Sequence, residues 1–103
     1  MNQKFELFID HVKECKQTCV QELAERKAGI PGESTIEQLE TIISEMDRLL
    51  RSLTVDTIPP GEKRFLISFA CAFKEWCWDM RKPTRLYSQL VALHNEYEGL
   101  KED

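Results

Sequence analysis

The stretch from Phe65 to Met80 constrains the fold most, because it has almost no polar side. A helix advances about 100° per residue, and on that spacing the stretch has one broad apolar face. Its members are Leu66, Phe69, Ala70, Phe73, Trp76, Cys77 and Met80. Ile67, Cys71 and Trp78 form a second apolar stripe roughly 100° away, which a single core face does not need. We therefore expect a helix buried on more than one side, within the fold or against another chain.

The length of 103 residues suits one domain, which we expect to span 1–103. The net charge of −4 argues against nucleic-acid binding, because nucleic-acid interfaces are usually basic. Basic residues nevertheless outnumber acidic ones between 62 and 85, so the remainder is strongly acidic. Two interpretations stay open: the acidic surface neutralises a basic partner, or it serves solubility.

No targeting or membrane-spanning segment is predicted. The longest uncharged run, Phe65 to Phe73, is far too short to span a bilayer. Lys4 and Glu6 interrupt the apolar residues at the start of the chain, so no signal peptide is expected. We expect a cytoplasmic protein with no membrane partner, whose four cysteines are free thiols.

Apolar residues recur every three or four positions, which predicts four helices. Their expected ranges are roughly Asn2 to Ala28, Ser34 or Thr35 to Leu53, about Glu62 to Arg81, and Pro83 or Thr84 onward. Gly29 stands where a glycine ends a helix, and Ser34 with Glu37 matches a capping box. Thr54 to Gly61 breaks the pattern. The predicted fold is an all-α, antiparallel four-helix bundle in which sequence neighbours pack side by side.

The second predicted helix has the most regular pattern. Its apolar positions follow a heptad: Ile36, Leu39, Ile43, Met46, Leu50 and Leu53, thickened by Ile42 and Leu49. Its expected outer face carries Glu40, Glu45, Asp47, Arg48 and Arg51. A heptad pattern this short is typical of a bundle helix.

His11, Cys15 and Cys19 form the nearest approach to a metal motif. Their i, i+4, i+8 spacing places them on one helical face, and imidazole and thiolate are zinc or copper ligands. The two cysteines also lie on the core stripe, where a free cysteine behaves as a small hydrophobe. We favour the core interpretation and keep the metal site as the alternative.

Acidic pairs offer a second metal alternative, a magnesium-dependent all-α bundle. The pairs are Glu37/Glu40, Glu40/Glu45 and Glu75/Asp79. They meet only if the polar faces of the second and third helices face each other, so a solvated face is the favoured interpretation. No spacing predicts a nucleophile with its base or a phosphate loop, and we expect neither an enzyme nor a bound cofactor.

These observations favour a small acidic protein that acts through protein–protein interaction, as a neutraliser, an immunity-like protein or a regulatory accessory protein. Tryptophan is enriched at interfaces, so the predicted partner-binding residues are Ile67, Cys71, Lys74 and Trp78. The partner is another protein or a second copy in a homodimer. The competing interpretation is that the bundle itself covers this stripe.

Overall fold

The all-α class is confirmed by the computed structural model, which describes residues 3–53 and 66–100. The four helices are α1 (Gln3–Lys27), α2 (Ile36–Ser52), α3 (Ile67–Lys74) and α4 (Arg85–Glu98). No strand occurs in these two ranges. The predicted break at Thr54 to Gly61 and the predicted helix start at Glu62 lie outside the described residues.

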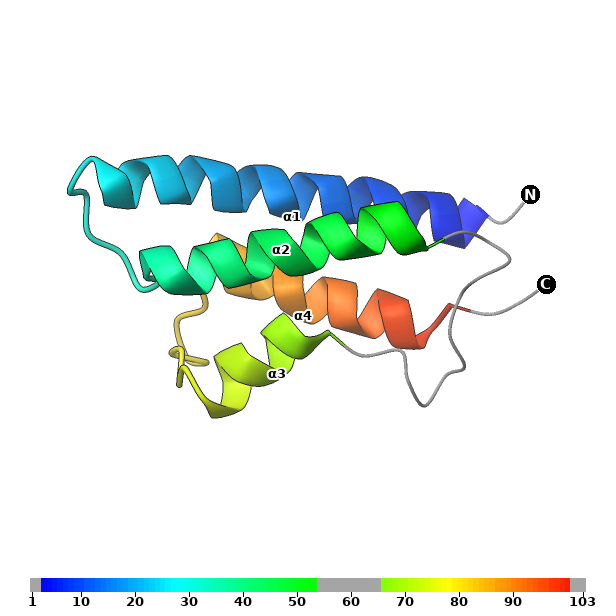
Figure 1. Cartoon of the computed structure of the whole chain (residues 1–103). Coiled ribbons are helices and arrows are strands. Elements are labelled where there is room, and N and C mark those ends of the chain that lie inside the picture. Colours follow the sequence, from blue (N-terminus) through cyan, green and yellow to red (C-terminus); the bar gives the residue numbers. More distant parts are fainter. Residues whose placement is uncertain (1–2, 54–65, 101–103) are drawn as a thin grey trace.

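Successive helices run in alternating directions around one core (Figure 1). The long helices α1 and α2 form a hairpin, α4 packs against α1, and α3 packs against both α4 and α2. The core draws on all four helices and the segments beside them. Its largest fully buried side chains are Phe8, Val12, Cys15, Leu39, Ile42, Met46, Leu49, Leu66, Leu86, Leu90, Leu93 and Leu100.

Gly29 ends α1 as predicted. Its φ of +89° lies in the left-handed region, where a residue without a Cβ carries little penalty. Gly29 N–H donates to the Arg26 carbonyl, and Ile30 N–H donates to the Glu25 carbonyl at 2.9 Å. These two bonds define a Schellman motif, which satisfies carbonyls left free at the helix end.

The Arg26 side chain then fastens the connection to α2. Its Nε donates to the Ser34 carbonyl at 2.7 Å and its Nη2 pairs with Glu22 Oε1 at 3.0 Å. A Cβ at Gly32 would collide with the guanidinium. A larger residue at position 32 would therefore have to displace the end of the Arg26 side chain.

The capping box of α2 lies one residue later than the predicted Ser34–Glu37 pair. Thr35 is the N-cap: its Oγ1 accepts from Gln38 N–H, and its own N–H donates to Gln38 Oε1, both at 3.1 Å. Ser34 is buried instead, and its Oγ has no partner among the described residues. The helix start at Thr35, one of the two predicted positions, is thus the one observed.

Thr35→Ala is expected to lower the free energy of unfolding by about 1 kcal/mol, because it leaves an N-terminal amide of α2 without its acceptor. The measurement is chemical denaturation followed by circular dichroism. Thr41→Ala is the matched control on the same helix, since Thr41 only bonds back to the Glu37 carbonyl. Equal losses in the two variants would contradict the cap assignment.

The buried face of α2 is rotated relative to the predicted heptad. Leu39, Ile42, Met46 and Leu49 are buried, whereas Ile36 is exposed. Ile43, Leu50 and Leu53 are only partly buried against the core. This rotation carries Glu45 inward as well, so its prediction as an outer-face residue is wrong.

Glu45 is 7% exposed and caps α3 from α2. Its two carboxylate oxygens accept the backbone N–H groups of Ile67 and Ser68, each at 2.8 Å. Those amides belong to the first turn of α3 and have no intrahelical acceptor. The N-cap residue Leu66 has no side-chain oxygen to offer, so α2 supplies the cap that the local sequence lacks.

The third helix is much shorter than predicted, ending at Lys74 instead of Arg81. Beyond it, Trp78 N–H donates to the Ala72 carbonyl at 3.1 Å, and Cys77 adopts a positive φ of 53°. The left-handed conformation reverses the chain and is unusual for a residue with a Cβ. The predicted continuous apolar face is wrong beyond Lys74, because Cys77 and Met80 are exposed.

Thr84 caps α4, which confirms the predicted start near Pro83 or Thr84. Its Oγ1 accepts from Tyr87 N–H at 3.1 Å. Helix α4 also contacts α3, where the ring of His94 stacks on that of Phe69 with centroids 4.4 Å apart.

Among the described residues, no helix combines the length and apolar character needed to cross a membrane.

Candidate interaction surface

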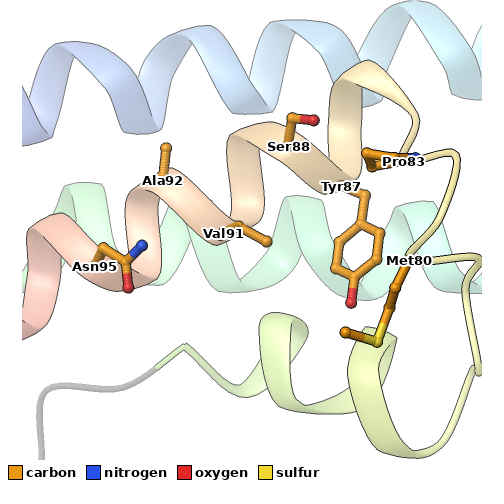
Figure 2. Close-up of a pocket in the computed structure, with 7 residues that line it drawn as sticks. All are labelled: Met80, Pro83, Tyr87, Ser88, Val91, Ala92 and Asn95. Atoms are coloured by element: carbon orange, nitrogen blue, oxygen red, sulfur yellow. The ribbon is translucent and has the colours of Figure 1, made fainter.

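An apolar groove follows the outer side of α4 (Figure 2). It encloses about 410 Å³ and is lined by Met80, Pro83, Tyr87, Ser88, Val91, Ala92 and Asn95. Tyr87 and Met80 converge at one end, and Val91 and Asn95 continue the lining along the helix. We call this surface the α4 groove.

The helical repeat of α4 explains which of its residues line the groove. Leu86, Leu90, Leu93 and Tyr97 face the core and are buried. Ser88, Val91, Ala92 and Asn95 lie on the opposite side and are exposed. The reversal at Cys77 brings Met80 beside them, where it is 59% exposed. Met80 and Val91 thus leave apolar surface exposed along the groove.

The two ends of the α4 groove carry opposite charge. Arg81, Lys82 and Arg85 are exposed around the N-terminus of α4, and none of them forms an ion pair with another described residue. Glu96 and Glu98 lie at the other end, paired with His11 and His94. The groove is therefore polarised along the helix axis.

A second, smaller hollow of about 210 Å³ lies between α1 and α4. Its lining residues are His11, Glu14, Gln89, Ala92, Leu93 and Glu96. His11 Nδ1 lies 2.8 Å from both carboxylate oxygens of Glu96. That hydrogen bond, with the charges of Glu96, Glu14 and Asp10, raises the pKa of His11 above 6.5 against the lowering effect of burial.

The His11–Glu96 pair is expected to make stability weakly pH-dependent. Because the pKa of His11 is raised by folding, the stabilisation is fully present below pH 6.5 and is lost as the pH rises through the folded-state value. The loss should stay under about 1 kcal/mol, since both side chains are partly exposed. Denaturation curves across this pH range measure it. Glu96→Gln should flatten this dependence; an unchanged dependence would contradict the assignment.

Trp78 does not belong to an exposed stripe. It is 4% exposed, its Nε1–H donates to Gln38 Oε1 at 3.1 Å, and its ring meets that of Tyr87 edge-on at 5.8 Å. The predicted stripe breaks because α3 ends before Trp78, so Ile67, Cys71 and Lys74 share a helix that Trp78 does not. Ile67 is 52% exposed, Cys71 is partly buried and Lys74 is exposed. Partner binding by these three residues stays a prediction.

The side chains predicted as alternative metal ligands, His11, Cys15 and Cys19, do not form a metal site in the structure. Cys15 and Cys19 are fully buried in the core, which confirms the favoured interpretation. The neighbouring Cys15 thiol and burial both raise the pKa of Cys19, which disfavours the thiolate that binds metal. His11 is held by Glu96 instead. Within residues 3–53 and 66–100, no three histidine, cysteine or acidic side chains are grouped to hold an ion.

Two of the three acidic pairs are separated as well, whereas Glu37 and Glu40 stay together on the exposed face of α2. Glu45 is turned inward onto the α3 amides, so it does not join Glu40 on the exposed face. Asp79 lies beyond the end of α3, where its N–H donates to Glu33 Oε2 at 2.9 Å and its Oδ1 accepts from Arg81 N–H. The predicted i, i+4 relation of Glu75 and Asp79 on one helix is wrong.

Sequence reasoning missed most of the α4 groove. Val91 is one apolar residue of a predicted helix, and Ser88, Ala92 and Asn95 carry no signal beyond their helical spacing. Met80 was assigned to the core because the third helix was predicted to continue. The opposite charges near Arg85 and Glu98 were present in the sequence but could be related only once α4 was placed.

Comparisons with known proteins provide no relative: no protein family, no curated protein and no solved structure matches this chain.

Proposed function

We propose that this protein is a non-catalytic cytoplasmic interaction protein whose α4 groove holds an amphipathic helix of a protein partner. The observation that carries the proposal is the groove itself, an apolar hollow of about 410 Å³ beside the exposed side chains of Met80 and Val91. Grooves of this kind bind the apolar face of a helix through side chains spaced three or four residues apart. A neutraliser or a regulatory accessory protein would act through such binding and needs no catalytic site.

The charges around the groove indicate the partner's chemistry. Arg81, Lys82 and Arg85 surround one end without ion-pair partners among the described residues. A helix with an acidic end placed there would gain electrostatic complementarity, which fixes orientation and speeds association. Small side chains at Ser88 and Ala92 let the backbone of such a helix come close. The partner helix is thus apolar on one face and acidic at one end.

A cytoplasmic location is supported by the cysteines, all four of which are free thiols in the structure. Cys77 is exposed, and free exposed thiols persist in reducing compartments. The metal-binding alternative has less support, because the side chains it needs are buried or paired elsewhere. The interaction proposal needs no rearrangement of the described residues.

Site-specific photocrosslinking tests the proposal in the cells that naturally produce this protein. The photoreactive residue p-benzoylphenylalanine replaces Val91 in the groove or, as the matched control, Ser44 on the exposed face of α2. We expect a discrete adduct from position 91, identified by mass spectrometry, and none from position 44. Adding Ala92→Arg, which projects a charge into the groove, should abolish the adduct.

Two outcomes would overturn the proposal. One is the absence of any adduct from position 91 in folded protein. The other is an adduct that forms equally from position 44 or survives Ala92→Arg. Arginine is a good helix former and Ala92 is exposed, so circular dichroism should show that the variant keeps its fold.

A further inference from the structure

We infer that the helix held in the α4 groove is α4 of a second copy of this chain, running antiparallel to the first. The inference rests on the proposed function and names the partner of the same site. Its basis is that the exposed side of α4 lines the groove and is apolar at Val91 and Ala92, so that the same surface of two copies can pack face to face. A surface that carries both halves of a contact suits a two-fold interface, in which the same patch serves each copy.

The spacing along α4 is symmetric about the point between Val91 and Ala92. When two antiparallel α4 helices cross there, Ser88 of one copy lies level with Asn95 of the other, and Arg85 lies level with Glu98. Ser88 and Ala92 are small, which permits the short interaxial distances seen between tightly packed helices. The short polar side chains of Ser88 and Asn95 can hydrogen-bond across the contact.

Charge selects the antiparallel direction. The N-terminal end of α4 is basic, with Arg81, Lys82 and Arg85, and its C-terminal end carries Glu96 and Glu98. Antiparallel helices place each basic end over the acidic end of the other copy, whereas parallel helices would place like charges together. The helix dipoles also favour the antiparallel pair, because opposite partial charges then meet.

The contact is short, so the association should be weak. The 14 residues of α4 span about 21 Å at 1.5 Å per residue. A single helix pair of this length buries less than the roughly 1,600 Å² of a standard stable interface. We therefore expect a monomer–dimer equilibrium that depends on concentration in the micromolar range, measurable by sedimentation velocity.

A charge-exchange experiment with the full chain tests the arrangement. Arg85→Glu and Glu98→Arg should each weaken dimerisation roughly tenfold, because each brings like charges together in the homodimer. An equimolar mixture of the two variants should dimerise as strongly as the original chain, since every pair across the contact is again of opposite charge. Glu40→Arg on the exposed face of α2 is the control and should leave dimerisation unchanged.

The two charge variants should both keep their fold, so weaker dimerisation in either would not come from misfolding. A glutamate at the first position of α4 and an arginine at its last both complement the helix dipole. A chain that stays monomeric at millimolar concentration would overturn the inference, and so would a mixture that associates no better than its components. If the chain is monomeric while position 91 crosslinks a different protein, the homodimer fails and the proposed function stands.

Discussion

Glu45→Ala is expected to lower the free energy of unfolding by about 3 kcal/mol. The substitution removes the acceptor of two backbone N–H groups, those of Ile67 and Ser68, and leaves them without a partner at the start of α3. Each buried donor left unsatisfied costs about 1–3 kcal/mol. For a domain of this size the loss corresponds to a melting temperature lower by more than about 10 °C. Thermal and urea denaturation followed by circular dichroism measure both quantities.

Glu40→Ala is the matched control for this prediction. Glu40 lies on the same helix but is exposed, and a surface change of this kind stays within about 0.5 kcal/mol. Glu45→Gln should fall between the two, since its amide keeps one acceptor oxygen for the α3 amides. If Glu45→Ala is no more destabilising than Glu40→Ala, Glu45 does not cap α3.

Trp78→Ala is expected to cost about 3–5 kcal/mol, the range for truncating a buried aromatic side chain to alanine. Trp78 is almost fully buried between Tyr87 and Trp76, with ring centroids 5.8 and 5.4 Å away. Its removal opens a cavity where the chain after α3 rejoins the core. Because domains of this kind have a total stability of about 5–15 kcal/mol, a substantial part of it would be lost. Equilibrium denaturation provides the measurement.

Two comparisons separate the contributions of Trp78. Trp78→Phe keeps an aromatic ring but loses the hydrogen bond to Gln38 Oε1, so it should cost less than Trp78→Ala. Met80→Ala is the control for the exposed side of the same segment and should cost less than about 1 kcal/mol. A Trp78→Ala variant as stable as Met80→Ala would contradict the buried position.

The fold class and most helix boundaries could be predicted because their signals are local. Three-and-four spacing determined α1, α2 and α4, and Gly29 and Thr84 stand where a helix end and a helix start are expected. The C-terminal end of the third helix could not be predicted, because no glycine or proline lies between Phe65 and Met80 to end it. The chain reverses at Cys77, in a conformation that its residue type does not suggest. Burial of Trp78 and its bond to Gln38 accompany that reversal.

Glu45 shows why the buried face of α2 could not be predicted correctly. On sequence alone a glutamate beside a heptad belongs to the solvated face. Its actual role depends on the amides of Ile67 and Ser68, which are more than twenty residues away in the chain. A cap supplied from another helix leaves no pattern in either segment.

The sequence predicts an exposed apolar surface but not the residues that form the α4 groove. The apolar stripe in the third quarter of the chain predicts partner binding at Ile67, Cys71, Lys74 and Trp78; of its apolar members only Ile67 is well exposed, and Met80, expected on the core face, is exposed instead. The expected anchor, Trp78, is in the core, and the groove runs instead along α4 through Val91 and Ala92. Locating it required the true end of α3, because that end decides which side chains the following segment presents.

Nuclear magnetic resonance across a concentration series tests the central claim, that two copies of the chain associate through the α4 groove and not through Trp78. We expect concentration-dependent shifts in the backbone amides of Met80, Ser88, Val91 and Asn95, with the indole N–H of Trp78 and the outer face of α2 unchanged. Shifts that centre on the Trp78 indole, or that bypass the α4 groove, would contradict the account.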